Sequence, residues 1–295
     1  MKERKEMITL CTVLVEELRP FMNLMIDSLL RKNKLVSNIL IAHVNSPYEY
    51  TQERHQQGVR IETFSHLLPH GLDTNEFGHA LGLHACIEKA NTPYVMFCDP
   101  DVLFIEDTPS FYLDLMKKLS LNYIGCSHEC AVQHPETYFP YVVNSLVKKA
   151  DLPNDDFMKN LLYYRGNLTA RTGDTLEDLG RYQPSPGKYL IRGFIPGTES
   201  QFPNAILRTE KIHTIDFDTG HLLYLWSLQQ KWRWLSFLTP DVHFYNTGYY
   251  RSNCGVKLPS DKKPLIYHLT GRYRKNGKGI DDFISQYASI KERND

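Results

Sequence analysis

The sequence lacks a net charge, because its 34 lysine and arginine residues balance its 34 aspartate and glutamate residues. A chain without excess positive charge has no general attraction for nucleic acid or for an anionic membrane surface, so we predict neither as a partner. The sequence also lacks an apolar run near the ~20 residues that a membrane-spanning helix needs. No apolar stretch with a cleavage site follows the charged residues 1–6, so we predict no signal peptide. We therefore expect a soluble, cytoplasmic protein without a transmembrane segment, and peripheral attachment to a membrane stays open.

Cysteine is scarce and scattered, with six residues in a chain of 295. Cys86 and Cys98 lie inside apolar segments, as reduced and buried thiols of a cytosolic protein do. The one group with zinc-type ligands at short spacing comprises Cys126, His128, Cys130 and His134. Zinc sites usually pair such ligands with a second set further along the chain, and none follows here. We favour packing, or the lining of an acceptor site, for this group.

The composition that remains is ordinary for a globular protein, with 42% hydrophobic and 23% charged residues. Short apolar runs alternate with amphipathic stretches along most of the chain. The pattern predicts strands at 7–15, 38–44, 59–64, 94–98, 122–126, 211–217, 232–238, 242–245 and 265–269. It predicts helices at 19–31, 75–90, 108–119, 155–164, 221–230 and 281–291. This order indicates an α/β fold with a mostly parallel central sheet flanked by helices.

The stretch 94–104 holds an apolar run that ends at two aspartates, Asp99 and Asp101. A short run that is apolar throughout predicts a strand buried on both faces. The two carboxylates should then emerge at the edge of a parallel sheet, where open α/β proteins bind ligands. Carboxylates this close repel each other, and Mg²⁺ or Mn²⁺ relieves that repulsion and could hold a diphosphate. The alternative is that the aspartates only end a strand, with Pro100 fixing the turn.

The order of these features resembles the GT-A nucleotide-sugar glycosyltransferases, close in pattern to glycosyltransferase family 2. In that family a second strand ends in a polar turn, here Asn45-Ser46, and a helix like 83–90 leads into a strand that ends in Asp-x-Asp. This chain departs from the pattern at three places: His84 replaces an asparagine, Cys86 replaces a glycine, and Asn45-Ser46 replaces an acidic pair. The resemblance covers residues 7–126 well and 210–275 loosely.

The resemblance implies a GT-A fold in a single domain, 1–295. Residues 7–126 would form the nucleotide-sugar-binding half, and 201–295 the acceptor and catalytic half with a C-terminal basic loop. The Tyr- and Pro-rich residues 127–200 would be an insertion that lines the cleft.

The resemblance also assigns residues to the donor site. Asp99 would lie near the ribose and the metal, and Asp101 would bind the metal, Mn²⁺ or Mg²⁺. The expected donor-binding residues are Thr12, Leu14, Asn45, Ser46, His84, Asp99, Arg272, Arg274 and Lys275.

In related enzymes an acidic residue at the start of a later helix is the general base, and Asp218 stands at that place. A carboxylate within hydrogen-bond reach of an acceptor hydroxyl can remove its proton. The alternative for Asp218 is a helix N-cap. Asp216 and Glu199 are weaker candidates for the base.

His268 precedes the basic loop that contains Arg272, Arg274 and Lys275. Several GT-A enzymes place a C-terminal histidine on the same metal and follow it with such a loop. A neutral imidazole can complete a Mn²⁺ site, and the basic side chains can offset the charge of a departing diphosphate. A structural histidine followed by a solvated loop is the alternative.

These observations predict a glycosyltransferase, of the hexosyltransferase class, that moves a sugar from a nucleoside-diphosphate donor to an acceptor hydroxyl with inversion. The acceptor is a glycan, a lipid-linked molecule or a protein. One alternative is a phosphatase that uses Asp99 and Asp101, with Asp281 and Asp282 as later metal ligands. The other is a non-catalytic protein that binds nucleotide sugars or glycans.

Overall fold

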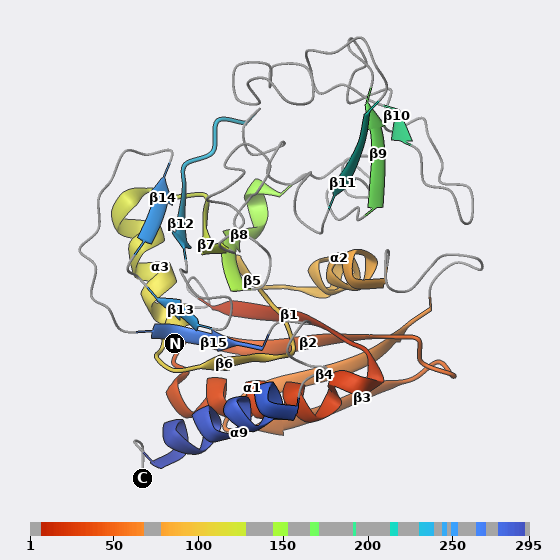
Figure 1. Cartoon of the computed structure of the whole chain (residues 1–295), viewed down its shortest axis with the longest axis vertical. Helices are drawn as coiled ribbons and strands as arrows, with labels where there is room; N and C mark the ends of the chain where they lie inside the picture. Colours follow the sequence, from red (N-terminus) through yellow and green to blue (C-terminus); the bar gives the residue numbers. More distant parts are fainter. Residues whose placement is uncertain are drawn as a thin grey trace.

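We analysed a computed structural model of the chain, which describes most of the first half and several segments of the second (Figure 1). The described residues are 7–67, 78–127, 144–152, 166–170, 191–192, 213–217, 230–238, 244–246, 249–252, 264–269 and 277–292.

A nine-stranded sheet forms the centre of the described structure, in the order β14-β12-β7-β8-β5-β1-β2-β4-β3. Most of its strands share one direction: β1 (Ile8–Leu14), β2 (Val36–Val44), β4 (Val59–His66), β5 (Tyr94–Cys98), β7 (Tyr123–Ser127) and β12 (Trp234–Leu238). Three strands run against their neighbours: β3 (Thr51–Gln56), β8 (Asn144–Lys148) and β14 (Tyr249–Ser252). The predicted α/β fold with a mostly parallel central sheet is therefore confirmed.

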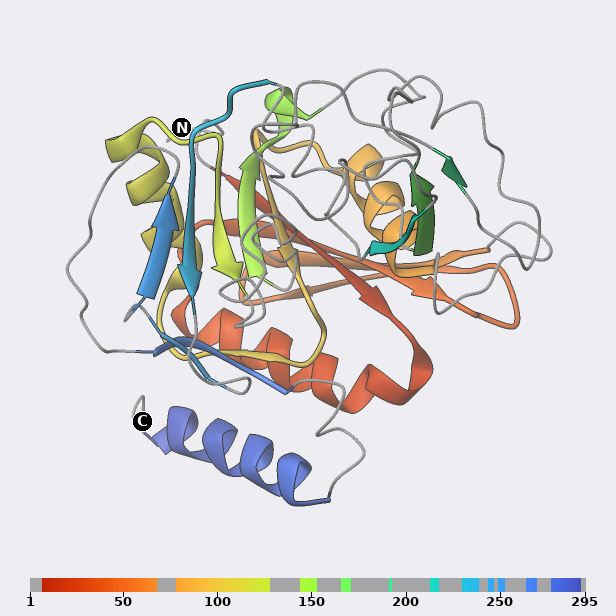
Figure 2. The same ribbon diagram turned by 45° about the horizontal axis from the view of Figure 1, so that its top comes forward.

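Helices cover both faces of this sheet (Figures 1 and 2). On one face lies α1 (Arg19–Lys32), and on the other α2 (His79–Lys89) packs on β1 and β2. Next to β7 lies α3 (Thr108–Leu119), which starts where the Asp107 side chain accepts a hydrogen bond from the Ser110 amide. Short 3-10 turns occur at Glu16–Leu18 and Lys149–Asp151. No helix in the described ranges has a stretch long and apolar enough to cross a membrane.

Two small sheets accompany the large one. In the first, β15 (Pro264–His268) pairs antiparallel with both β6 (Val102–Phe104) and β13 (Phe244–Asn246). In the second, β9 (Gly166–Ala170) lies between β10 (Ile191–Arg192) and β11 (His213–Phe217). The second sheet lies on the same side of the central sheet as α2 (Figure 1).

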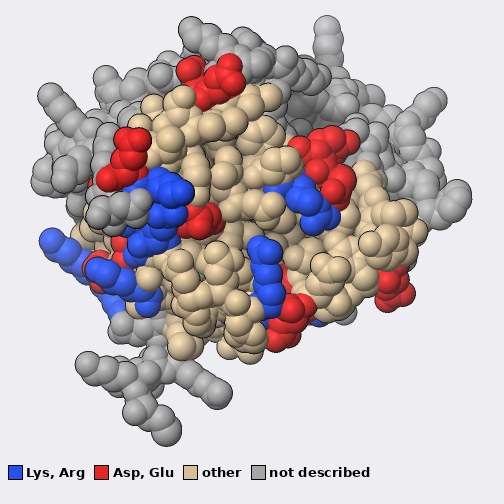
Figure 3. Space-filling model, turned by 90° about the horizontal axis from the view of Figure 1, so that it is seen from below, with Lys and Arg blue, Asp and Glu red and all other residues tan. Residues whose placement is uncertain are grey.

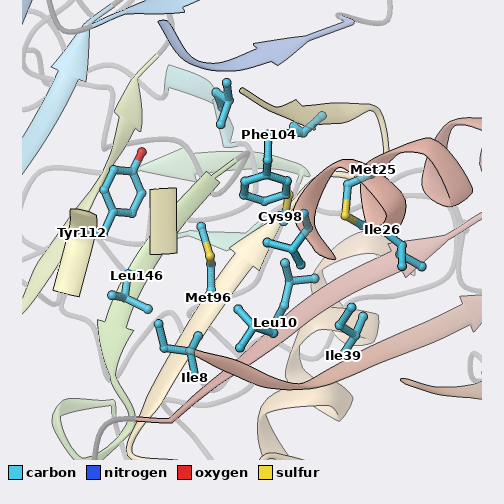
Figure 4. Close-up of a cluster of buried hydrophobic side chains, with 14 of the residues drawn as sticks. Ile8, Leu10, Met25, Ile26, Ile39, Met96, Cys98, Phe104, Tyr112 and Leu146 are labelled. Carbon is cyan, nitrogen blue, oxygen red and sulfur yellow. The ribbon is translucent and has the colours of Figure 1, made fainter. Parts of the chain in front are cut away.

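The main hydrophobic core lies between the central sheet, α1 and α3 (Figure 4). Leu10 and Met96 project from β1 and β5, and Met25 and Ile26 meet them from α1. Burying aliphatic side chains of this size contributes roughly 1.5–3 kcal/mol each. Because Phe104 of β6 belongs to the same core, the segment that follows Asp99 and Asp101 is held against α1.

Three strands of the central sheet, β3, β8 and β14, are not predicted from the sequence. All of β3 except the partly buried Gln56 is exposed, and its residues are polar, as suits the edge of a sheet. In contrast, β8 is inserted in the middle of the sheet, between β5 and β7. It belongs to the stretch 127–200, so part of the expected insertion is a strand of the core sheet. The predicted helix at 155–164 lies outside the described residues, as does nearly all of the one at 221–230.

The C-terminal helix, α9 (Gly277–Glu292), packs on the outside of α1 (Figure 2). Its fully buried Phe283 contacts Phe21 of α1 edge to face, with ring centroids 5.5 Å apart, and Tyr267 of β15 at 5.9 Å. Aromatic pairs at such distances contribute about 0.5–1.5 kcal/mol beyond the area that they bury. The helix therefore joins α1 to the strand that carries His268.

A polar contact adds to this junction, since the Tyr287 hydroxyl donates a hydrogen bond to the Asp27 carboxylate, which also accepts one from Arg31 at 3.0 Å. Burial would raise the pKa of Asp27, but the hydrogen bonds from Tyr287 and Arg31 outweigh burial and hold the pKa below its usual value. Charged groups on this side of the molecule are interspersed by sign (Figure 3). The contact is therefore local and not part of a large charged patch.

We predict that Tyr287→Phe lowers the free energy of unfolding by about 1–2 kcal/mol at about pH 7, because Asp27 loses a donor. A carboxylate with a lowered pKa stabilises the fold above the pKa of the unfolded chain, ~3.9, and loses that contribution as the pH falls. The difference between wild type and variant should thus shrink toward about pH 3 in urea titrations. Tyr48→Phe, at an exposed tyrosine, is the control. A difference that stays constant with pH would contradict the carboxylate contact.

Candidate metal centre

The parallel strands bring several of the predicted residues to one edge of the sheet. The carboxyl ends of β1, β2 and β5 lie side by side, because β1 pairs in parallel with both β2 and β5. Asp99 follows the end of β5, and Asn45 follows the end of β2. Ligand sites of open α/β sheets lie at this edge.

Three acidic or imidazole side chains converge at this edge: Asp99, Asp101 and His268. One ligand atom from each lies within 4.8 Å of the others. His268 Nε2 is 3.5 Å from Asp101 Oδ1 and 3.7 Å from Asp99 Oδ2. The side chains of Asp101 and His268 are 1% and 6% exposed, and that of Asp99 is 17% exposed. The two carboxylates and the imidazole are therefore enclosed in the fold and not a chance cluster on its surface.

Backbone pairing carries His268 to the two aspartates. In the register of β15 and β6, His268 stands opposite Val102. Just beyond the paired residues, the Leu269 amide donates to the Asp101 carbonyl oxygen at 3.0 Å. At the other end of β15, the Ile105 amide donates to the Leu265 carbonyl oxygen at 3.0 Å. Both ends of β15 are thus fastened to the segment that contains Asp101.

Two buried hydroxyl groups, those of Ser28 and Thr108, hold the segments that carry Asp101 and His268 in place. Ser28 of α1 accepts a hydrogen bond from the Phe104 amide at 3.0 Å and donates one to the Met25 carbonyl oxygen at 2.8 Å. Thr108 donates to the Leu265 carbonyl oxygen at 3.1 Å. The first bond ties β6 to α1, and the second ties the start of α3 to β15. The carboxylates and the imidazole therefore stand on backbone that is held on several sides.

The chemistry and spacing of this donor set fit a divalent cation. Carboxylate oxygens suit Mg²⁺ and Mn²⁺, and a neutral imidazole suits the transition metals. The distances from His268 Nε2 to the two carboxylates, 3.5 and 3.7 Å, are longer than those of ordinary N–H···O hydrogen bonds. Atoms that share a cation at 2.0–2.2 Å lie ~3–4 Å apart, and the separations of 3.5 and 3.7 Å fall in that range. We call this group the Asp99–Asp101–His268 centre.

A second histidine, which the sequence analysis missed, touches the centre. His79 Nε2 lies 3.2 Å from Asp99 Oδ1. The sequence could have indicated His79. A crossover helix runs back across the sheet, so its first turn starts at the carboxyl edge, and a histidine in that turn is expected near the strand ends. His84, selected from the family pattern, lies five residues further along α2 and thus ~7 Å further from that edge.

The other predicted residues that the structure describes are not members of the Asp99–Asp101–His268 centre. Leu14 is fully buried in the main core, and Thr12 is fully buried on the same strand. Asn45 is exposed with a φ of 62°, a left-handed conformation that asparagine tolerates, and the adjacent Ser46 hydroxyl donates to the Tyr48 carbonyl oxygen at 2.7 Å. Asn45 and Ser46 thus form a turn at the end of β2.

His84 faces a different pair of groups. Its Nε2 lies 3.7 Å from Glu88 Oε1 on the next turn of α2. Burial, and then the neighbouring His84, lower the pKa of His66 at the end of β4. His84 therefore interacts with Glu88 and His66, and it is not a member of the Asp99–Asp101–His268 centre.

Several predicted residues lie outside the described part of the chain. They are the base candidates Asp218 and Glu199, the basic residues Arg272, Arg274 and Lys275, and the zinc-type ligands His128, Cys130 and His134. Asp216 lies in β11 and Cys126 in β7, where the backbone alone is described. Their roles remain predictions.

The carboxylates that a phosphatase would need do not join the centre. Asp281 and Asp282 are exposed on α9, and within the described residues the metal-ligating group contains Asp99, Asp101 and His268 alone. Within the described part of the chain, the phosphatase alternative therefore has no second set of ligands.

Comparisons with known proteins find similar solved structures but no similar sequence family or curated protein. The sequence matches no protein-family model. No curated protein matches it. Among solved structures, TarS from S. aureus in complex with UDP-GlcNAc shares 11% identity at a TM-score of 0.38, over 51% of this chain and 48% of that chain.

Two further solved structures resemble the chain to a similar degree. A mannosyltransferase from Pyrobaculum calidifontis with GDP-Man and Mn²⁺ shares 11% identity at a TM-score of 0.36, over 49% of this chain and 45% of that chain. Glucosyl-3-phosphoglycerate synthase from Mycobacterium tuberculosis, with Mn²⁺, UDP-glucose and phosphoglyceric acid, shares 14% identity at a TM-score of 0.32, over 50% of this chain and 58% of that chain. This chain thus spans about half the length of these solved chains.

We predict that Ser28→Ala lowers the free energy of unfolding by about 1–2 kcal/mol, because the buried Phe104 amide loses its acceptor at a cost of ~1–3 kcal/mol. The better helix propensity of alanine returns ~0.5 kcal/mol of that loss. Ser285→Ala, on the exposed face of α9, is the matched control for propensity and should be neutral or slightly stabilising. Denaturant unfolding measures both variants, and equal effects in the two would contradict the role of the Ser28 hydroxyl.

Proposed function

We propose that this protein is a metal-dependent glycosyltransferase that moves a sugar from a nucleoside-diphosphate donor to an acceptor hydroxyl. The convergence of Asp99, Asp101 and His268 at the carboxyl edge of the central sheet carries the proposal. Two enclosed carboxylates beside an imidazole at this edge are suited to hold a cation, and a diphosphate is a ligand that such a cation commonly shares.

Asp99, Asp101 and His268 would hold the cation, and Asp99 would also lie near the ribose of the donor. A bound cation supplies positive charge that stabilises a departing diphosphate. The imidazole of His268 favours Mn²⁺ over Mg²⁺, because Mg²⁺ binds almost entirely through oxygen. The enclosed position of Asp101 and His268 strengthens these contacts, since a charge interaction grows as water is excluded.

The rest of the donor site would come from both halves of the chain. Thr12, Leu14, Asn45, Ser46 and His84 belong to the half, 7–126, that would bind the base and ribose. Arg272, Arg274 and Lys275 would offset the charge of the diphosphate, with arginine giving forked contacts to phosphate.

Asp218 would act as general base, with Glu199 and Asp216 in reserve. It would take the proton of the acceptor hydroxyl while the acceptor oxygen forms a bond to the anomeric carbon. The bond from that carbon to the diphosphate oxygen breaks in the same step, so the configuration inverts. The sugar would be a hexose, and residues 127–200 and 201–295 would present a glycan, a lipid-linked molecule or a protein as acceptor. We expect the reaction to take place in the cytoplasm.

We predict that Asp101→Asn abolishes Mn²⁺-dependent binding of nucleoside diphosphates, because it removes a charged and buried oxygen ligand. Thermal unfolding with UDP and GDP, each with and without Mn²⁺, measures binding as a rise in the midpoint, since a ligand of the native state stabilises it. Asp114→Asn, an exposed aspartate of α3, is the matched control and should behave as wild type. Wild-type protein that binds no nucleotide in the presence of any divalent cation would overturn the proposed function.

We predict that Asp218→Asn lowers the rate of sugar transfer or of donor hydrolysis by about 100-fold or more, while donor affinity is retained, because a general base commonly contributes 10²–10⁴-fold. The assay for donor hydrolysis measures how fast the nucleoside diphosphate is released. Asp282→Asn, an exposed aspartate of α9, is the control. An unchanged rate would refute the role of Asp218, and loss of rate in Glu199→Gln instead would transfer that role to Glu199. No turnover in wild type with intact donor binding would identify a non-catalytic binding protein.

A further inference from the structure

His79 makes the closest of the three contacts between an imidazole and a carboxylate at the centre. Its Nε2 lies 3.2 Å from Asp99 Oδ1, whereas His268 Nε2 lies 3.7 Å from Asp99 Oδ2. A separation of 3.2 Å is at the long end of the range in which an imidazole N–H donates to a carboxylate oxygen. The two oxygens of Asp99 therefore face two different histidines, one on α2 and one on β15.

The packing of α2 fixes where His79 stands. The helix lies on β1 and β2, and its Gly82 approaches them closely. A Cβ atom at Gly82 would lie 2.8 Å from Val13 Cγ2 and 3.3 Å from the Ala42 Cβ, so a larger residue would require either the Val13 side chain or the helix to shift. His79 lies one turn before Gly82 on the same helix. Close contact at Gly82 therefore holds the first turn of α2 at the edge where Asp99 emerges.

The three members of the centre are not fixed to the same degree. Asp101 and His268 are almost wholly buried, and backbone hydrogen bonds join the segments that carry them. Asp99 is more exposed, at 17%. A carboxylate that must be ordered when a cation binds loses side-chain freedom at that moment, which weakens binding. A partner that orients the carboxylate beforehand removes this loss.

We infer that His79 is a positioning residue that orients Asp99 for the cation. With its proton on Nε2, the imidazole holds Oδ1 and leaves Oδ2 turned toward His268 and the shared ligand position. Groups that orient metal ligands in this way commonly change metal affinity by 10–100-fold when they are removed. The inference rests on the proposed function, because it assumes that the centre binds a cation.

The test measures Mn²⁺ affinity without any donor, by electron paramagnetic resonance of free Mn²⁺ in titrations of the whole protein. His79→Ala should weaken affinity by about 10–100-fold. His79→Gln places an amide N–H near the position of Nε2 and should recover most of that loss. His55→Ala and His55→Gln, at an exposed histidine of β3, are the matched controls and should bind as wild type does. Circular dichroism and thermal unfolding confirm that every variant is folded.

The outcomes separate the inference from the proposed function. If wild type binds Mn²⁺ and His79→Ala binds it within about twofold, a change of ~0.4 kcal/mol, the inference is wrong and the proposed function stands. If His79→Gln is as weak as His79→Ala and loses a nitrogen coupling in pulsed spectra of bound Mn²⁺, His79 is a direct ligand and not a positioning residue. If wild type binds no Mn²⁺ in the absence of donor, the inference is wrong, and the nucleotide titrations with divalent cations decide the proposed function separately.

Discussion

The pairing of β15 with β6 is the interaction on which the candidate centre depends. Thr108 and Leu265, which are hydrogen bonded at one end of this pairing, stand 157 residues apart in the chain. At the other end, the Leu269 amide reaches the Asp101 carbonyl oxygen. Without this pairing the two aspartates would end a strand and do nothing more. With it, an imidazole arrives beside both carboxylates and the three can share a ligand.

The rest of the described structure supports this pairing from two sides. Ser28 and the core around Met25 hold β6 against α1, and Phe283 holds β15 through Tyr267. On the opposite face of the sheet, Gly82 lets α2 approach β1 closely, which brings His79 to Asp99. Each of these contacts is ordinary packing or hydrogen bonding. Together they limit the freedom of Asp99 and Asp101, whose mutual repulsion would otherwise drive the two carboxylates apart.

The sequence predicts the elements with strong periodicity and misses those without it. The strand 94–98 and the helix 108–119 are found with the predicted bounds, because an unbroken apolar run and a Pro-led amphipathic stretch are clear signals. No such signal exists for β3, whose polar residues are exposed at an edge, or for β8, which lies in a stretch with no regular pattern. Their pairing is decided by neighbouring strands and not by their own residues.

At the site too, the sequence predicts the features that have a local signal and misses those that depend on tertiary packing. The position of Asp99 and Asp101 at a strand end is local information, and the sequence contains it. The arrival of His268 depends on the register of β15 with β6, which no local pattern specifies, so only the family resemblance pointed to it. The contact of His79 with Asp99 depends on how closely α2 packs on the sheet. A residue pattern shows which face of a helix is buried, but it does not show the distance between the helix and the sheet. The family pattern therefore led to His84, while helix geometry leads to His79.

The insertion of β8 between β5 and β7 bears on how such a protein could diversify. Ser127 ends β7 and Asn144 begins β8, and because these strands are antiparallel, both residues lie at the edge of the sheet near Asp99. The connection between them therefore leaves and re-enters the sheet beside the centre. Its length and composition can change at little cost in chain entropy and without altering the register of any strand. Selection could thus alter what approaches Asp99 while the backbone that holds Asp101 and His268 stays the same.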